Sequence, residues 1–439
     1  MQPQATLGNI WKPLNIVINQ DYFKNKNITV VGLGRSGFAC AELLYNVGAR
    51  VSITEKNNNP QIAAYVQKLP PSIKKELGRH TPEFIQGRDL IVTSPGVDND
   101  SEPLIWARKF DIPVISEIEC AWILCPATVI AITGTNGKTT TTTLIGRVLE
   151  RAGKSSFILG NIGTPFSAYV DKMKPGDFVS LEVSSFQLET TAKFKPKISV
   201  ILNFTPDHLD RYTDLSKYLS AKCRIFFNQD ESDYLVLNRD DPVICDLARR
   251  SKAKVIYFDS RIHPNPNFAA VKAVAAILGI DSNFCEEVFR TFKGLPHRLE
   301  RIADFKNREF INDSKATNPD STAFALYSIS KPIILIAGGR DKGLDFSLIE
   351  DLICQKVKAL ILVGEAKDKI RQIFQKKLPI KETSNLEEAV ILAFDRSEAG
   401  DCILLSPMCS SFDMFQDFEH RGEVFRQAVI SLMEHYAAT

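Results

Sequence analysis

The stretch Ile130-Ala-Ile-Thr-Gly-Thr-Asn-Gly-Lys-Thr-Thr140 decides the fold of this chain. It joins an apolar β-branched run to a turn with two glycines, and apolar residues at helical spacing follow at 144–149. Backbone N–H groups of such a turn and the positive end of the next helix bind phosphate oxygens, and a neighbouring hydroxyl can hold Mg²⁺. Because Ile132 stands where the common phosphate-loop pattern has glycine, the spacing predicts a variant loop built on Gly134 and Gly137. The alternative is an ordinary strand, turn and helix with Gly-Lys-Thr by chance.

Composition limits the kinds of protein that this chain can be. Its 439 residues exceed the roughly 250 to 300 at which a single core stops growing, so we expect two or three domains. A net charge of +2 gives no argument for a nucleic-acid partner. The nine cysteines include no Cys-x-x-Cys pair, which argues against a zinc ribbon or a disulfide framework and favours a reducing cytoplasm. Without a signal-like start or about 18 consecutive apolar residues, we expect a cytoplasmic protein with no stable membrane insertion.

The order of predicted elements indicates the fold class. Short β-branched runs alternate with helical patterns, which predicts an α/β fold with mostly parallel sheets. Three such series can be separated, with boundaries near residues 118 and 298. We therefore expect a Rossmann-like domain at 1–118, a central ATPase domain of P-loop type at 119–298 and a second Rossmann-like domain at 299–439.

The first domain carries a second glycine-rich turn. Gly32-Leu-Gly-Arg-Ser-Gly37 follows a predicted strand, and the next strand ends at Glu55, about where a carboxylate would bind the ribose of a dinucleotide. An NAD-dependent oxidoreductase is therefore a real alternative. Such an enzyme has no need of a second phosphate loop with a lysine, so the two loops together indicate two phosphorylated ligands.

Three side chains of the central domain could carry chemistry. Glu182 ends a predicted strand, where α/β sheets bind ligands, and could join Thr139 on a phosphate-bound Mg²⁺, although a solvated strand end is the simpler interpretation. His208 follows the next strand and could be a metal ligand or a capping residue. Lys222 falls on the apolar stripe of a predicted helix, so it either extends along that face to solvent or is desolvated and reactive, including toward CO₂. A carbamate on Lys222 would be a carboxylate-like metal ligand beside His208.

Three polar segments of the last domain each follow a predicted strand. They are Asn312-Asp-Ser-Lys-Ala-Thr-Asn318, Gly338-Gly-Arg-Asp-Lys-Gly343 and Ser406-Pro-Met-Cys-Ser-Ser-Phe-Asp413. Their cationic and hydroxyl groups would face one edge of the sheet, which suits an acidic substrate. Taken alone, each segment is better explained as a polar connection.

Taken together, these segments resemble the Mur ligases, ATP-dependent amide-forming enzymes of peptidoglycan synthesis, over nearly the whole chain. The phosphate loop at 133–140, the segment Leu181-Glu-Val-Ser-Ser-Phe-Gln-Leu-Glu189 and residues 203–211 look like the family's ATP loop, metal-binding strand end and histidine loop. Segments 312–318 and 406–415 look like the member that adds D-glutamate to UDP-N-acetylmuramoyl-L-alanine. The Asp-Asn-Pro-Arg type motif of the member that adds diaminopimelate or lysine does not occur.

The resemblance implies roles for particular residues. It implies ATP contacts from Gly134, Thr135, Asn136, Gly137, Lys138, Thr139, Thr140, His263, Asn267, Arg298 and Asp313. It implies contacts to the UDP substrate from Arg35, Ser36, Gly37, Glu55, Lys56, Ser94, Gly160 and Asn161. It implies D-glutamate contacts from Lys315, Thr317, Lys342, Ser411 and Phe418. Mg²⁺ would be held by Thr139 and Glu182, and a second Mg²⁺ by His208 and carbamylated Lys222, so that Lys138, Glu182, His208 and Lys222 form the catalytic set.

The chain departs from the family pattern at two places. Between Asp259 and His263 the family usually has a longer insert that contains strands, and Pro264 stands where the family often has Asn. Glu55 and Lys56 stand where other members offer Thr and Arg to the uridine phosphates.

The resemblance implies an ATP- and Mg²⁺-dependent ligase that forms an acyl phosphate of UDP-N-acetylmuramoyl-L-alanine and transfers the acyl group to D-glutamate. We expect a monomer. The alternatives are a Mur-type ligase for another amino acid, a folate-glutamate ligase, the NAD-dependent oxidoreductase and a non-catalytic nucleotide sensor. A folate ligase would have no reason to carry the glycine turn at 32–37, and a sensor would need no second metal site.

Overall fold

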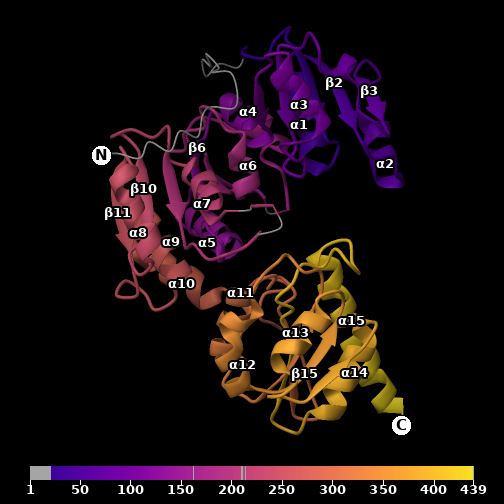
Figure 1. Ribbon diagram of the computed structural model, residues 1–439. Helices are drawn as coiled ribbons and strands as arrows, with labels where there is room; N and C mark the ends of the chain where they lie inside the picture. Colours follow the sequence, from indigo (N-terminus) through magenta and orange to yellow (C-terminus); the bar gives the residue numbers. More distant parts are fainter. Residues whose placement is uncertain (1–20, 162, 209–210, 213, 439) are drawn as a thin grey trace. The chain divides into compact units, whose positions relative to one another are not determined.

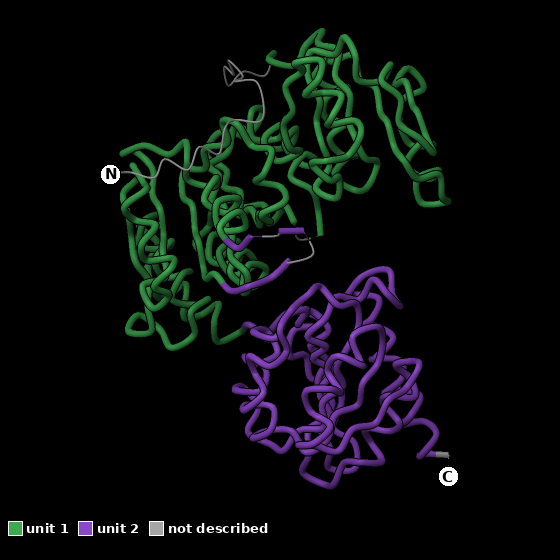
Figure 2. Tube along the Cα trace, viewed as in Figure 1, with its two compact units in different colours: residues 1–204, 216–291 green, residues 205–215, 292–439 purple. Residues whose placement is uncertain are grey.

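The computed structural model describes residues 21–161, 163–208, 211–212 and 214–438 (Figure 1). The chain divides into two compact units (Figure 2). Unit 1 comprises the residues up to 204 together with 216–291, and unit 2 comprises 205–215 and 292–439. Among the described residues, no helix has both the length and the hydropathy needed to cross a bilayer.

The first sheet of unit 1 is parallel and has the order β3-β2-β1-β4-β5. Its strands are β1 (Asn27–Val31), β2 (Arg50–Glu55), β3 (Lys74–Leu77), β4 (Leu90–Thr93) and β5 (Val114–Ser116). The helices of this part are α1 (Arg35–Asn46), α2 (Pro60–Lys68), α3 (Glu102–Lys109) and α4 (Glu117–Leu124). The strand order reverses between β1 and β4, so the carboxyl end of β1 is a switch point, where open α/β sheets bind ligands.

The second sheet of unit 1 is also parallel, in the order β11-β10-β9-β6-β8-β7. Its strands are β6 (Thr128–Thr133), β7 (Ser156–Gly160), β8 (Phe178–Glu182), β9 (Ile198–Ile201), β10 (Tyr234–Asn238) and β11 (Lys254–Phe258). The helices are α5 (Lys138–Arg151), α6 (Ser185–Glu189), α7 (Leu215–Cys223), α8 (Pro242–Asp246), α9 (Pro266–Ile277) and α10 (Ser282–Thr291). Ile132 on β6 pairs with Glu182 on β8, which places that carboxylate beside the start of the phosphate loop.

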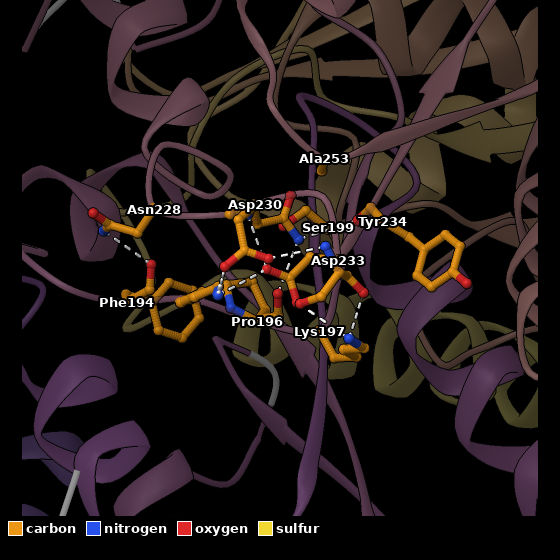
Figure 3. A network of polar contacts seen from close by, with 12 residues as sticks. Phe194, Pro196, Lys197, Ser199, Asn228, Asp230, Asp233, Tyr234 and Ala253 are labelled. Carbon is orange, nitrogen blue, oxygen red and sulfur yellow. Dashed lines mark hydrogen bonds and ion pairs between the residues drawn. The ribbon is translucent and has the colours of Figure 1, made fainter.

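Polar contacts fasten the amino ends of the central strands (Figure 3). The Lys195 ammonium lies 2.5 Å from Asp230 and 3.2 Å from Asp233, and Lys197 lies 3.4 Å from Asp233. The Gln229 amide donates to the carbonyl of Pro196 at 2.9 Å, so the segment that enters β9 is tied to the segment that enters β10. The amino edge of the sheet is thus fixed by its own side chains, and the loops at the carboxyl edge carry the predicted ligand-binding residues.

Unit 2 contains a six-stranded sheet in the order β12-β13-β17-β14-β15-β16. The strands are β12 (Glu300–Phe305), β13 (Arg308–Asn312), β14 (Ile333–Gly338), β15 (Val357–Val363), β16 (Ile380–Glu382) and β17 (Cys402–Leu405), and only the pairing of β12 with β13 is antiparallel. Helices α11 (Pro319–Ser328), α12 (Glu350–Lys356) and α13 (Lys367–Phe374) pack on one face, and α14 (Leu386–Arg396) and α15 (Phe418–Ala438) pack on the other.

Short 3₁₀ turns complete the connections at Pro82–Phe84, Phe166–Ala168, Val170–Lys172, Leu247–Arg250 and Phe346–Ile349. The predicted α/β fold with mostly parallel sheets is confirmed. Parallel strands buried on both faces read as continuous apolar runs, and Ile333–Gly338 of β14, with all six residues buried, illustrates the pattern that made this prediction possible.

Candidate active site

The phosphate loop connects β6 to α5 in a conformation that requires both of its glycines. Gly134 has φ 152° and Gly137 has φ 79°, values that side-chain-bearing residues rarely adopt. A Cβ on Gly137 would also collide with the Asn267 side chain. Since α5 begins at Lys138, directly after Gly137, its first N–H groups and its positive end lie at the loop, as an anion-binding site needs.

Asn203 holds the first half of this loop. Its Oδ1 accepts from the N–H groups of Thr135 at 3.0 Å and Asn136 at 2.8 Å, and its Nδ2 donates to the carbonyl of Asn136 at 3.1 Å. The N–H groups of Thr135 and Asn136 therefore point at Asn203. The N–H groups of the second half of the loop, from Gly137 onward, are the ones that can bind phosphate. Asn203 was predicted only as the start of the histidine loop at 203–211, although its place directly after a buried strand pointed to a role of its own.

Lys138 and Lys222 meet at the same backbone carbonyl. Lys138 Nζ donates to the carbonyls of Gly134 at 2.9 Å and Thr135 at 2.7 Å, and Lys222 Nζ donates to that of Gly134 at 2.8 Å. Lys222 is 1% exposed and lies 4.3 Å from the ring centroid of Tyr218. Of the two alternatives for Lys222, the structure shows the desolvated one, and its nitrogen lies directly behind the phosphate loop.

Glu182 and Thr139 offer oxygen atoms next to this loop. Both are buried, Glu182 at the end of β8 and Thr139 in the first turn of α5. Glu182 Oε1 accepts from Asn161 Nδ2 at 2.9 Å, which orients the carboxylate. Hydroxyl and carboxylate oxygens are the ligands that Mg²⁺ prefers, and it usually takes one or two of them beside phosphate oxygens and water. The donor set fits Mg²⁺, and across the described part of the chain no cluster of three His, Cys, Asp or Glu forms an all-protein cage.

A pocket of about 610 Å³ opens beside the glycine turn of the first sheet. Seven of the eight residues predicted to contact the UDP substrate line it: Arg35, Ser36, Glu55, Lys56, Ser94, Gly160 and Asn161. Gly37 is not among the lining residues, and a Cβ there would collide with the carbonyl of Gly32, so it allows helix and strand to pack closely. His80 also lines the pocket, although no sequence pattern pointed to it.

The Glu55 carboxylate is committed to the backbone of this pocket. Its Oε2 accepts from the N–H of Leu33 and its Oε1 from the N–H of Asn57, both at 2.7 Å. Each carboxylate oxygen can accept a second hydrogen bond, so these two bonds order the neighbouring loops and still allow Glu55 to contact a ligand in the pocket.

The residues predicted to lie near the adenine follow the shortened segment. The backbone N–H of Ile262 donates to the carbonyl of Asp259 at 3.1 Å, so the segment closes as a tight turn. His263 Nδ1 then accepts from the N–H of Asn265, and Asn265 caps α9. Asn267, in the first turn of α9, accepts from Thr141 Oγ1 at 3.3 Å and therefore lies against α5 and the phosphate loop.

Within unit 2, a buried ion pair joins the histidine loop to the last sheet. Lys342 Nζ lies 2.5 Å from Asp207 Oδ1, and Asn318 Nδ2 donates to Asp207 Oδ2 at 3.0 Å. Burial opposes ionisation of Asp207, but the charges of Lys342 and His208 outweigh it and hold the pKa of Asp207 below its usual range. His208 itself has φ 55°, a strained conformation for a residue with a side chain.

Asp313 lies buried at the end of β13. Its Oδ2 accepts from Ser406 Oγ at 2.9 Å and its Oδ1 from the N–H of Leu299 at 3.2 Å. Burial raises the pKa of Asp313 to about 7, although the positive charge of nearby Arg298 opposes the shift. We therefore expect this carboxyl to gain or lose a proton near neutral pH.

The residues predicted to bind D-glutamate come from three adjacent strand ends. Strands β13, β17 and β14 are neighbours, so the loops with Lys315 and Thr317, with Ser411 and with Lys342 leave the same edge of the sheet. Lys315 Nζ lies 4.3 Å from the ring centroid of Phe418, the first residue of α15. The structure thus brings these five side chains to one region of unit 2.

Comparison with known families gives matches along most of the chain. Residues 26–116 match the family described as Mur ligase MurD-like, N-terminal domain; residues 132–276 match the Mur ligase middle domain; and residues 297–409 match the Mur ligase, glutamate ligase domain.

Individual proteins are similar over nearly their full length. UDP-N-acetylmuramoylalanine--D-glutamate ligase of Caldanaerobacter subterraneus subsp. tengcongensis is 40% identical over 93% of this chain and 99% of its own. The ligase of the same name from Koribacter versatilis is 39% identical over 94% of this chain and 98% of its own. Among solved structures, UDP-N-acetylmuramate-alanine ligase of Thermotoga maritima aligns over 93% of this chain and 100% of its own chain. The TM-score is 0.58 at 20% sequence identity, which shows a common fold.

Proposed function

The chain belongs to the Mur ligase family, and on that premise we propose that it joins D-glutamate to UDP-N-acetylmuramoyl-L-alanine at the expense of ATP, in the synthesis of peptidoglycan precursors. The observation that carries this proposal is the 40% identity, over 93% of the chain, to a ligase of that name. The strand-end loops of unit 2, with their lysines and hydroxyls, support an acidic amino acid as the second substrate.

The reaction has two steps. The alanine carboxylate of the UDP substrate attacks the γ-phosphorus of ATP, which releases ADP and leaves an acyl phosphate. The amine of D-glutamate, once it has lost a proton, attacks the acyl carbon, and phosphate leaves as the amide forms. Positioning and charge stabilisation supply most of the catalysis of such a phosphoryl transfer.

The phosphate loop holds the ATP phosphates in this proposal. The N–H groups from Gly137 to Thr140 bind the β- and γ-phosphates, and Lys138 leaves its carbonyl partners to neutralise the transferred group. Bound Mg²⁺ would further neutralise the phosphate oxygens, with Thr139 and Glu182 as its protein ligands. A second Mg²⁺ would be held by His208 and by Lys222 as a carbamate, which would supply a negatively charged oxygen while its remaining N–H could keep the bond to Gly134.

The pocket of unit 1 receives the UDP part of the acceptor. Arg35, Ser36 and Lys56 give hydrogen-bond donors for the diphosphate, and Asn161 joins this pocket to Glu182 through the bond between them. We assign the substrate, ATP and amino-acid functions to residues 1–118, 119–298 and 299–439, a division supported by the three separate sheets. The cytoplasmic location and the monomeric state stay predictions, and light scattering on the purified protein tests the second.

Phosphate release with a panel of amino acids tests the proposal. Purified protein is incubated with ATP, Mg²⁺ and UDP-N-acetylmuramoyl-L-alanine, and D-glutamate, L-glutamate, lysine or diaminopimelate is added. We expect release with D-glutamate alone, and loss of it in Lys138→Met but not in Lys154→Met, an exposed lysine beyond the end of α5. Release with another amino acid instead would favour a different Mur-type ligase, and no release together with NADH binding would favour the oxidoreductase.

A further inference from the structure

Arg421 is a buried arginine in the first turn of α15. It is 2% exposed and is one of the largest fully buried side chains in the described part of the chain. A guanidinium is rarely buried unless a carboxylate or a full set of acceptors compensates for its lost hydration. No sequence pattern pointed to this residue, since an arginine near the start of a long helix normally lies at the surface.

Four hydrogen bonds compensate for the burial of Arg421. Nε donates to Ser314 Oγ at 3.0 Å and Nη2 to the Ser314 carbonyl at 2.7 Å. Nη1 donates to the carbonyls of Cys409 at 3.1 Å and Ser410 at 3.2 Å. None of these four acceptors is a carboxylate, so the planar fork of the guanidinium here binds two loops together rather than forming a salt bridge.

A third loop is bonded to one of the carbonyls that Arg421 holds. The N–H of Arg340 donates to the carbonyl of Ser410 at 2.9 Å, and a Cβ on Gly339 would approach Arg421 Nη1 to 3.1 Å. Gly339 has φ 131° and can therefore bring the backbone this close. Arg421 thus bonds directly to the loops that follow β13 and β17, and the loop that follows β14 joins them through the carbonyl of Ser410.

We infer that Arg421 is the positioning residue of the D-glutamate site: its guanidinium fixes the three loops that carry Lys315, Thr317, Ser411 and Lys342. The inference rests on the proposed function, and it deepens it by naming what holds the amino-acid site together. Burial lowers the pKa of Arg421 to about 10, so the side chain is still a cation at neutral pH. A fixed positive charge behind the loops also favours the binding of a dicarboxylate.

Steady-state kinetics with all three substrates test the inference. The variants are Arg421→Lys, which keeps the charge but loses the fork, Arg421→Met, which loses both, and Ser314→Ala, which removes one acceptor. Arg396→Met, at an exposed arginine of α14, is the control. A shift of about 1 Å in a binding loop costs on the order of 100-fold in rate, so we expect kcat/KM for D-glutamate to fall about 100-fold in Arg421→Met. We expect a fall of about tenfold in Arg421→Lys and Ser314→Ala, in each of which hydrogen bonds are lost.

The pattern of KM changes among the three substrates distinguishes a positioning role of Arg421 from a general structural role. Positioning raises the KM of D-glutamate and leaves the KM values of ATP and the UDP substrate within about twofold, whereas partial unfolding reduces the active fraction without changing any KM. If Arg421→Met does not fold, Arg421→Lys and Ser314→Ala decide. An unchanged KM for D-glutamate in these two folded variants would refute the inference.

The proposed function can fail separately. A wild-type enzyme that uses a different amino acid would refute the function, and the inference would then be read from the KM of that amino acid. A wild-type enzyme that uses D-glutamate but whose variants change only kcat would keep the function and refute the inference.

Discussion

Replacing Asn203 by leucine should weaken ATP binding while leaving the pocket for the UDP substrate intact. Leucine has nearly the same shape as asparagine but neither accepts nor donates hydrogen bonds. The substitution therefore releases Thr135 and Asn136 from the three side-chain bonds that now fix the first half of the phosphate loop.

The size of the effect follows from those bonds. At a net value of about 1 kcal/mol each, three bonds amount to about 3 kcal/mol of loop ordering. Asn203 is half-buried, so hydrogen bonds to water compensate for part of the lost free energy. With about 1.4 kcal/mol for each factor of ten in affinity, we expect the Kd of ATP to rise between about tenfold and about 100-fold.

Calorimetric titration with a non-hydrolysable ATP analogue measures this change. The control is Asn228→Leu, which removes bonds from the Asn228 amide to the carbonyls of Ala192 at 3.1 Å and Phe194 at 3.2 Å, before β9 rather than after it (Figure 3). Both variants should lose thermal stability, but only Asn203→Leu should lose affinity for the nucleotide. A folded Asn203→Leu enzyme with wild-type affinity would show that the loop needs no clamp.

Three further predictions concern other side chains. Lys222→Ala should lose most activity, and acetate should restore part of it by replacing the carbamate; a folded variant that short carboxylates do not rescue would contradict the carbamate. Burial raises the pKa of Glu119 to about 7, so the folded chain keeps a proton that the unfolded chain releases above about pH 4.5. The free energy of unfolding therefore falls as the pH rises from 5 to 7.5. Glu119→Gln removes this titration and should make that fall shallower. The shift corresponds to a stability change on the order of 3 kcal/mol, and equal slopes of melting temperature against pH in both proteins would contradict it. Lys342→Met should destabilise unit 2 by about 3 to 5 kcal/mol, since it leaves the buried Asp207 carboxylate without its cation. Asp207→Asn in the same chain should restore most of the melting temperature. If the stability losses of the two single variants simply added in the double variant, that result would contradict a buried ion pair.

The features that the sequence predicted well are the ones that depend on neighbouring residues. The phosphate loop at 133–140 could be located because turn glycines, a lysine and a following helix are adjacent in the chain. The helical spacing placed Lys222 on an apolar stripe and left two directions open, and the structure shows the buried one, with the lysine 1% exposed.

The features that were missed depend on distant parts of the chain. Arg421 is buried by loops 11 and 107 residues away, at Ser410 and Ser314, and nothing near α15 in the sequence records those contacts. The hydrogen bonds that the Glu55 carboxylate accepts from the N–H groups of Leu33 and Asn57 were also not predicted. The predicted role of Glu55 as a contact to the UDP substrate stays a prediction, and the residue does line the pocket of unit 1. Local chemistry therefore indicated which loops carry candidate ligand-binding residues, and tertiary packing decided which side chains hold those loops.

Isotope transfer from the acyl substrate tests the central claim most directly. UDP-N-acetylmuramoyl-L-alanine labelled with ¹⁸O in the alanine carboxylate is incubated with ATP, Mg²⁺ and D-glutamate, and the phosphate and the UDP product are analysed by mass spectrometry. An acyl phosphate requires one ¹⁸O atom in each released phosphate and one in the new amide carbonyl. Label in AMP, unlabelled phosphate, or no product that has gained a D-glutamyl residue would contradict the account.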